Sequence, residues 1–189
     1  MGPLDIALFH AFNAGPGTPA WLLALARWAS ETLPTLAGVG LALALALQPR
    51  RSWRAVLLCV AALLVGWCLA QVVRAWVPMP RPGALGIGMQ WIAHGKRAGF
   101  PSLHATGAFA FAAALWLAGA RRWALPALAV ALLIAWSRVC LGVHFPSDVL
   151  AGMLTGTLAA CIAAAVGGAA RALLRKRAIA PAPQETPPA

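Results

Sequence analysis

The chain has few charged side chains, and acidic ones are the scarcest. Of its 189 residues 10% are charged, with only 4 Asp and Glu against 15 Lys and Arg, and Tyr is absent. Soluble domains carry about 25% charged and about 45–50% apolar residues, whereas hydrophobic residues make up 61% here. This composition excludes an ordinary soluble domain and predicts an integral membrane protein.

Paired cysteines and clustered metal ligands are missing too. The 4 cysteines lie inside apolar segments without a Cys-x-x-Cys pair, which argues against a disulfide framework and against a zinc site. We therefore expect neither a metal nor another cofactor. The N-terminus lacks a basic region followed by an apolar run and a small-residue cleavage site, so we expect no cleavable signal peptide.

The basic residues, which give a net charge of +11, occur in short clusters between apolar runs. Such clusters are typical of loops that orient membrane helices and not of nucleic-acid interfaces. We expect membrane lipids around the protein and no nucleic-acid partner. The sequence does not indicate an oligomeric state.

Long apolar runs predict an all-α bundle of about five to six transmembrane helices, since a bilayer crossing takes about 20 such residues. The expected spans are Trp21 to Leu47, Ala55 to Val73, Ser102 to Ala120, Trp123 to Val143 and Val149 to Ala170. Leu4 to Ala14 is too short to span and is expected at the interface, although residues 4–19 leave a spanning helix open. Residues 1–177 are expected to form a single membrane domain, and the Pro-rich residues 178–189 a disordered tail.

Further expectations concern the polar residues within the first span and the tryptophans near span ends. Arg27 and Glu31 lie four residues apart with opposite charges, so we expect a structural ion pair, with a polar opening near the site as the alternative. Pro34 is expected to kink the same helix. Near span ends we expect interfacial anchors at Trp21, Trp76, Trp91 and Trp123.

The basic clusters predict the orientation of the bundle. Three of them fall on one side, which the positive-inside bias makes the cytoplasmic side: 50–54, 121–122 and 171–177. The loop from Pro78 to Phe100 falls on the opposite side, where His94, Lys96 and Arg97 are expected to face solvent or headgroups. The reactive polar residues lie at span ends on that opposite side, so we expect them to face away from the cytoplasm.

Three arginines and one helix start suit a phosphoryl group. Arginine is permanently charged and offers a fork of donors, so Arg74, Arg81 and Arg138 would neutralise a phosphate if they converge. Ser102 is expected at the N-cap of the third span, whose free backbone N–H groups attract anions. His104 would then lie in the first turn, beside the same anion.

His144 and Asp148 suit nucleophilic chemistry. Histidine can attack phosphorus when a carboxylate holds its other ring nitrogen, and Asp148 lies four residues on. In one continuous helix Arg138 and His144 would point about 240° apart. We therefore expect the chain to leave the helix near Gly142 and to restart around Pro146 and Ser147.

Together these segments resemble the three motifs of the type-2 phosphatidic acid phosphatase superfamily, which also contains the vanadium haloperoxidases. The matching residues are Arg74, six others and Arg81-Pro82; Pro101-Ser102-Leu103-His104; and Ser137-Arg138, five others, His144, three others and Asp148. All spacings agree. Arg74 stands where the family usually has lysine and Leu103 where it usually has glycine.

The resemblance implies a role for each of these residues. His144 would form a phosphohistidine, Asp148 would orient it, and His104 would protonate the leaving group and then activate water. Phosphate binding would involve Arg74, Arg81, Ser102 and Arg138. The family works without a metal, so the activity implied is that of a metal-independent phosphatase.

Within the superfamily the chain is most similar to the small bacterial undecaprenyl-diphosphate phosphatases, from DIALFHAFNAGPGTPAW through IAWSRVCLGVHFPSDVLAG. The implied function is hydrolysis of undecaprenyl diphosphate, which recycles a carrier lipid for cell-wall synthesis at the outer face of the bacterial inner membrane. Phosphatidylglycerol phosphate, phosphatidate and lipid A phosphate are alternative substrates. A lipid phosphotransferase and a membrane protein without enzymatic activity also stay open.

Overall fold

The computed structural model describes residues 2–47, 53–93 and 98–179, and within these ranges it contains helices and connecting loops but no strand. The elements are α1 (Pro3–Phe12), α2 (Ala20–Arg27), the π-helix η1 (Trp28–Thr32), α3 (Leu33–Leu47), α4 (Trp53–Trp76), the 3₁₀-helix η3 (Pro82–Leu85), α5 (Leu103–Leu117), α6 (Arg121–Cys140) and α7 (Pro146–Ile179). The predicted all-α membrane bundle is confirmed.

Among the described residues, three helices are long and apolar enough to cross a membrane: α4, α6 and residues Pro146–Lys176 of α7. Helices α2, η1 and α3 follow one another without a break and cover the first predicted span. Helix α5 has 15 residues and is about 22 Å long, less than the ~30 Å of a hydrocarbon core. Residues 178 and 179, predicted to begin the tail, belong to α7, and the rest of the tail lies outside the described residues.

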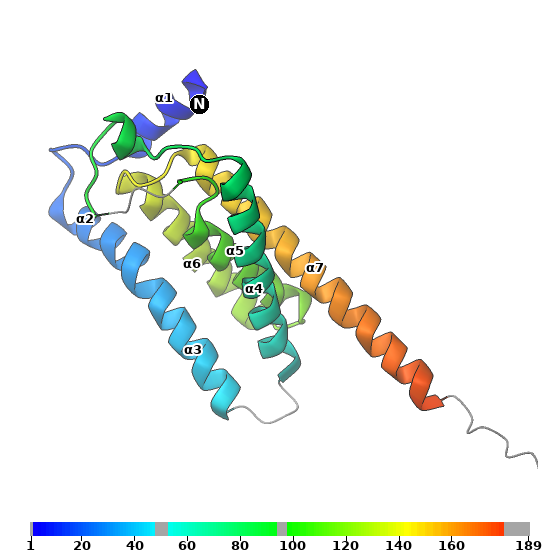
Figure 1. The fold of residues 1–189 in the computed structure, drawn as a ribbon. Coiled ribbons are helices and arrows are strands. Elements are labelled where there is room, and N and C mark those ends of the chain that lie inside the picture. Colours follow the sequence, from blue (N-terminus) through cyan, green and yellow to red (C-terminus); the bar gives the residue numbers. More distant parts are fainter. Residues whose placement is uncertain (1, 48–52, 94–97, 180–189) are drawn as a thin grey trace, which may run out of the picture.

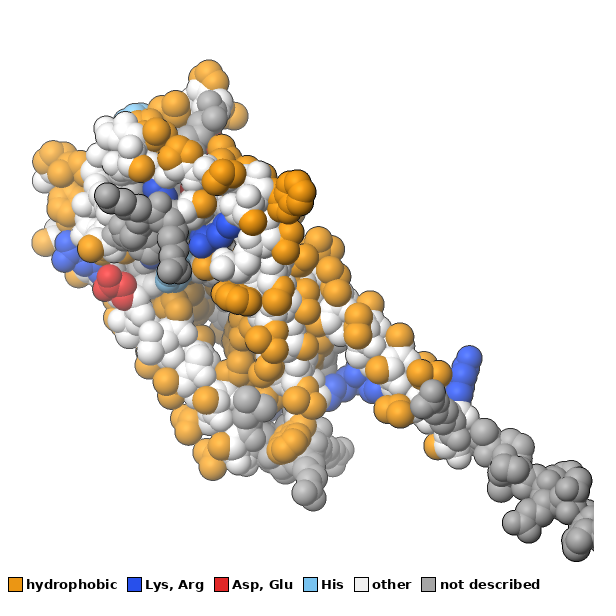
Figure 2. Space-filling view, viewed as in Figure 1, with side chains coloured by type: hydrophobic (Ala, Val, Ile, Leu, Met, Phe, Trp, Pro, Cys, Tyr) orange, Lys and Arg blue, Asp and Glu red, His pale blue; other side chains and the backbone are white. Residues whose placement is uncertain are grey.

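The helices lie side by side with their ends at two levels (Figure 1). Helix α3 ends and α4 begins at one level, where α5 also turns into α6; the long loop after α4 and the connection from α6 to α7 lie at the other. Figure 2 shows hydrophobic side chains along the flank between these levels. Exposed leucines occur on α3, α4, α6 and α7 and include Leu43, Leu64, Leu132, Leu154 and Leu158. A surface with exposed apolar side chains of this kind suits contact with lipid chains.

Helix α1 lies across the end of the bundle that carries the long loop (Figure 1). It has 10 residues, about 15 Å, and residues 13–19 after it are not helical, so residues 4–19 form no spanning helix. Phe9 of α1 is fully buried, and its ring centroid lies 5.2 Å from that of Phe145. Helix α1 therefore packs on the segment between α6 and α7.

Two glycines allow α5 and α7 to approach closely. Gly152 and Gly156 lie one turn apart on α7, and a Cβ atom at Gly152 would be 2.6 Å from the carbonyl oxygen of Ser102. This Gly-x-x-x-Gly spacing is typical of close backbone contact between membrane helices. At the start of both helices the Ser102 N–H donates to the Asp148 carbonyl at 2.9 Å. The start of α5 is thus fixed against the first turn of α7.

The π-helix η1 directly precedes Leu33 and Pro34, and the kink expected at Pro34 stays a prediction. Pro34 has no N–H to donate to the Ser30 carbonyl, and the N–H of Leu33 bonds five residues back, to the Trp28 carbonyl. The expected pairing of Arg27 with Glu31 is wrong, since no ion pair joins them in the described chain. The wider π turn removes the alignment of residues four apart, and Arg27 donates to the Trp91 carbonyl at 3.1 Å.

Candidate active site

The residues of all three predicted motifs lie at one end of the bundle. Each is placed by the end or the start of a helix: Arg74 in the last turn of α4, Arg81 just before η3, Ser102 at the N-cap of α5 with His104 in its first turn, Arg138 in the last turn of α6, His144 between α6 and α7, and Asp148 in the first turn of α7. Three segments far apart in sequence therefore contribute to one site.

The connection between α6 and α7 returns His144 to the end of α6. Helix α6 ends at Cys140 and α7 begins at Pro146, as predicted, and Gly142 has a φ of +72°. A side chain there would adopt the left-handed conformation that glycine tolerates best, and it would collide with the backbone of Met89. The N–H groups of Val143 and His144 donate to the Arg138 carbonyl at 3.1 and 3.3 Å. This turn brings His144 beside Arg138.

His144 and Asp148 form a buried pair. Their side chains are 1% and 0% exposed, and Nδ1 of His144 lies 3.3 Å from Oδ2 of Asp148. The same oxygen accepts the N–H of Phe145 at 2.9 Å. Nε2 of His144 lies 3.0 Å from Nη1 of Arg81. Because a guanidinium can only donate, Nε2 is the acceptor and the proton belongs on Nδ1, facing Asp148. Nε2 therefore carries the lone pair that a nucleophile needs.

Three guanidinium groups converge around this pair. Arg81 is buried and donates to the Val143 carbonyl at 2.9 Å, and Arg74 donates to the Pro101 carbonyl from Nε and Nη2 at 3.3 and 3.0 Å. Arg138 is 1% exposed and donates from Nη1 to the Ser30 hydroxyl.

Burial, and then the charge of Arg74, lower the pKa of Arg81 to about 10, while Asp148 opposes the shift. Arg81 stays charged at neutral pH and also repels Arg138. With one buried carboxylate near three cations, the site attracts an anion.

The start of α5 adds a hydroxyl group to the site. Ser102 stands at the N-cap, as predicted, but its side chain makes no capping hydrogen bond. Its Oγ is buried and has no hydrogen-bond partner in the part of the chain that the structure describes. A buried hydroxyl of this kind is costly unless a ligand satisfies it. The hydroxyl and the N-terminal N–H groups of α5 together suit a phosphate.

Sequence reasoning missed three residues that hold the site from outside the motifs. Asp5 accepts two hydrogen bonds from Ser147, and Ser30 accepts one from Arg138. Asn13 donates to the carbonyls of Met89 and Cys140 at 2.9 and 3.1 Å. The only signal for Asp5 was an acid within an apolar helix.

Trp91, whose role as an interfacial anchor stays a prediction, makes two hydrogen bonds to other parts of the chain. Its Nε1 donates to the Ala14 carbonyl at 2.7 Å, and its backbone N–H donates to the Leu141 carbonyl at 3.0 Å. The long loop is therefore fastened to the segment after α1 and to the end of α6. The predicted loop residues His94, Lys96 and Arg97 lie outside the described residues.

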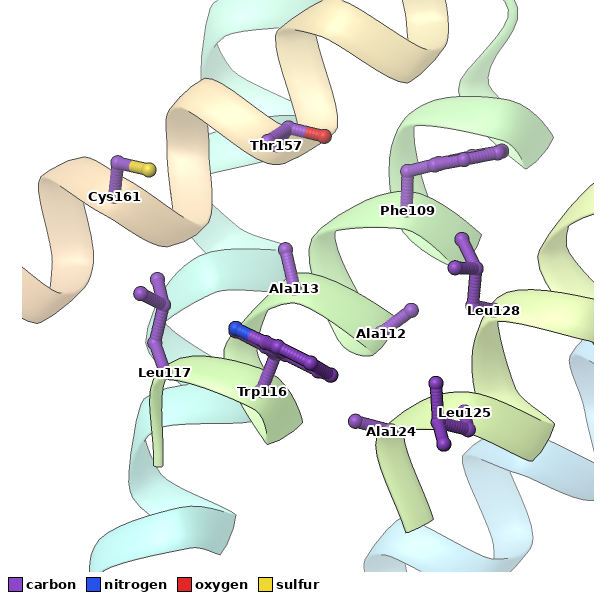
Figure 3. A pocket seen from close by; sticks show the side chains of 10 residues that line it. All are labelled: Phe109, Ala112, Ala113, Trp116, Leu117, Ala124, Leu125, Leu128, Thr157 and Cys161. Carbon is purple, nitrogen blue, oxygen red and sulfur yellow. The ribbon is translucent and has the colours of Figure 1, made fainter. Parts of the chain in front are cut away.

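An apolar cavity of about 230 Å³ lies between α5, α6 and α7 (Figure 3). Its walls include Phe109, Trp116 and Leu128, and Thr157 contributes the only hydroxyl group among the lining side chains. None of the predicted site residues lines it. Apart from the Thr157 hydroxyl and the Cys161 thiol the lining is hydrocarbon or aromatic, so the cavity suits hydrocarbon.

Comparisons with known proteins found related sequences. The sequence profile of the PAP2 superfamily matches residues 54–171. An Escherichia coli K12 protein named "Putative undecaprenyl-diphosphatase YbjG" is 35% identical over 169 residues, 86% of this chain and 82% of that protein. Decaprenylphosphoryl-5-phosphoribose phosphatase of Mycobacterium tuberculosis H37Rv is 36% identical over 128 residues, 68% of each chain.

Two crystal structures share the fold. LpxE of Aquifex aeolicus superposes with a TM-score of 0.71 at 22% identity, covering 86% of this chain and 95% of that one. A PAP2 type phosphatidylglycerolphosphate phosphatase of Bacillus subtilis gives a TM-score of 0.63 at 24% identity, covering 87% and 85%. At these identities the likeness concerns the arrangement of the helices.

Proposed function

This chain belongs to the PAP2 superfamily and is a membrane phosphatase, and on that premise we propose that it hydrolyses undecaprenyl diphosphate to undecaprenyl phosphate and inorganic phosphate. One observation carries the chemistry. Nε2 of the buried His144, whose Nδ1 faces Asp148, points at Arg81 within a group of three arginines. A nucleophile is thus placed where a phosphoryl group would bind.

In the first step Nε2 of His144 attacks the terminal phosphorus. The phosphoryl group takes the place beside Nε2 that Arg81 occupies in the structure, and Arg81 then donates to a phosphoryl oxygen. The bond between phosphorus and the bridging oxygen breaks, and His104 gives its proton to the departing undecaprenyl phosphate. Arg74, Arg138, Ser102 and the N-terminus of α5 stabilise the charge on the transferring oxygens. Asp148 stabilises the positive charge that develops on the imidazole ring.

In the second step water replaces the histidine. His104, now neutral, accepts a proton from water as the oxygen attacks phosphorus. The bond between phosphorus and Nε2 breaks, and the electron pair returns to His144. Inorganic phosphate leaves, and the enzyme is restored without a metal in either step.

Two relatives support a polyprenyl substrate. Both the Escherichia coli and the mycobacterial protein carry names that refer to polyprenyl compounds. The match to the first covers more of the chain, 86% against 68%. A phosphomonoester on a polyprenyl-linked sugar is the second candidate, because the mycobacterial relative is equally similar over its aligned part.

The distribution of basic residues supports a site that faces the outside of the inner membrane. Arg121 and Arg122 begin α6, and Arg171, Arg175 and Lys176 lie in the last turns of α7, at the end of the bundle opposite the site (Figure 1). By the positive-inside bias this end is cytoplasmic. A carrier lipid released as its diphosphate on the outer face would then meet the site directly.

The test measures phosphate release by the detergent-purified protein from undecaprenyl diphosphate, decaprenylphosphoryl-5-phosphoribose, phosphatidylglycerol phosphate and phosphatidate. We expect the highest kcat/KM with undecaprenyl diphosphate, and release by His144→Ala at background level. An acid quench should trap an acid-labile phosphoenzyme in the wild type and none in His144→Ala. Faster turnover of another lipid would overturn the proposed substrate. Transfer of the labelled phosphoryl group to a lipid acceptor instead of water would overturn hydrolysis as the reaction.

A further inference from the structure

The first turn of α7 is held by a carboxylate from the other end of the sequence. Oδ1 of Asp5 accepts the backbone N–H of Ser147 at 2.9 Å, and Oδ2 accepts its hydroxyl at 2.6 Å. The N–H groups at a helix start have no partner within the helix, and a carboxylate stabilises them and the positive end of the helix dipole. Because both donors of Ser147 are engaged, its backbone and its side chain are fixed together.

Helix α1 is well placed to hold this turn. Phe9, one turn after Asp5, is fully buried against Phe145. Asn13 accepts the N–H of Met89 at 2.7 Å in addition to its two donated bonds. Helix α1 is therefore attached at its start, middle and end.

The segment that Asp5 holds connects the nucleophile to its partner. Ser147 lies directly before Asp148, and Phe145, which packs on α1, directly follows His144. The distance between Nδ1 of His144 and Oδ2 of Asp148 is 3.3 Å, already longer than the usual 2.9–3.0 Å of such bonds. A small shift of this turn would therefore break the hydrogen bond that orients the imidazole ring.

We propose that Asp5 is a positioning residue for the reaction, which keeps His144 and Asp148 in register by binding Ser147. This inference rests on the proposed phosphohistidine mechanism. Asp5 touches neither substrate nor reacting atoms in this scheme. Its loss slows the attack by His144 while the arginines still bind phosphate, so kcat falls and KM does not.

The experiment compares Asp5→Asn, Ser147→Ala and their double variant with the wild type. Asparagine has the same shape without the charge: its Oδ1 accepts the Ser147 N–H as a neutral bond, and its NH₂ group can only donate to the Ser147 hydroxyl, so both charge-assisted bonds are lost. For Asp5→Asn we expect kcat and the rate of phosphoenzyme formation to fall about 10-fold, with KM changed less than about two-fold. Ser147→Ala keeps the backbone bond and should lose less, and the double variant should lose less than the product of the two. His10→Ala, an exposed residue of α1, is the matched control and should behave as wild type.

A second measurement does not depend on turnover. In protein labelled with ¹⁵N-histidine, the signal that disappears in His144→Ala reports the Nδ1–H tautomer, and it should shift or broaden in Asp5→Asn. A lower Tm with unchanged kcat and an unchanged His144 signal would make Asp5 an anchor of α1 only and overturn the proposal. A rise in KM alone would also overturn it. Failure of the proposed function looks different, because the wild type itself would then release no phosphate from undecaprenyl diphosphate.

Discussion

A methyl group at Gly152 should damage the site by pressing on the backbone of Ser102. In Gly152→Ala the new Cβ would lie 2.6 Å from the Ser102 carbonyl oxygen and 2.9 Å from Cβ of Ala105, whereas ordinary contact begins at 3.4 Å. The first neighbour is backbone and cannot rotate away. Helices α5 and α7 must therefore separate by the difference, about 0.8 Å at this level.

The separation acts on the hydrogen bond between Ser102 N–H and the Asp148 carbonyl, one turn away. Its 2.9 Å would become about 3.7 Å, beyond the range of a hydrogen bond. Overpacking of this kind costs about 1–3 kcal/mol of stability. A displacement near 1 Å between the two halves of an active site can cost about 100-fold in rate, so we expect kcat to fall about 10–100-fold.

The assay combines phosphate release with thermal unfolding of the purified protein in detergent. Gly107→Ala on α5 is the matched control, because its Cβ would meet only the Leu63 side chain at 3.8 Å. We expect Gly107→Ala to keep the wild-type kcat and to have an equal or higher Tm, since alanine favours helix over glycine by about 1 kcal/mol. If Gly152→Ala matched Gly107→Ala in both kcat and Tm, the reasoning from close helix packing would be refuted.

Three further predictions test the site itself. Asp148→Asn should lower kcat by about 10²–10⁴-fold with the protein still folded, because the amide no longer stabilises the charged imidazole; an unchanged kcat would remove Asp148 from the mechanism. Ser30→Ala removes the hydroxyl that accepts a hydrogen bond from Arg138, and a hydrogen bond to a charged group contributes about 1.5–3 kcal/mol. We therefore expect inhibition by orthovanadate, a phosphate analogue, to weaken about 10-fold. Thr35→Ala is the control, because the Thr35 hydroxyl bonds to the Glu31 carbonyl of its own helix. Phosphate release should be the same with and without EDTA, and activity lost to EDTA and restored by a divalent cation would contradict the metal-independent route.

Local signals explain which parts of the site could be predicted from the sequence. The start of α5 at Ser102 and the break near Gly142 follow from residues that favour helix caps and left-handed turns wherever they occur. Long apolar runs likewise located α4, α6 and α7, although α7 begins three residues earlier and continues nine residues beyond the predicted span. These features depend on short stretches of chain.

The contacts that sequence reasoning missed depend on residues far apart. Trp91 bonds to Ala14 across 77 positions, and Ser30 lies 108 positions from Arg138. The π-helix before Pro34 changed which residues face each other on the first long helix, so the rule for residues four apart failed at Arg27. From the sequence alone, several groups are equally suitable hydrogen-bond partners for a tryptophan or an acid near a span end. Which of them lies within reach depends on the tertiary structure.

The bond between Asp5 and Ser147 joins residues 142 positions apart, and this separation has a consequence for biosynthesis. Asp5 is made before the helices α2 to α6, but its partner Ser147 is made only after all of them. Helix α1 must therefore wait, undocked, while the rest of the bundle inserts. The nucleophile is held in place only when the first helix closes onto the last, so a nascent chain that stops before α7 has no assembled site with which to attack the lipids around it.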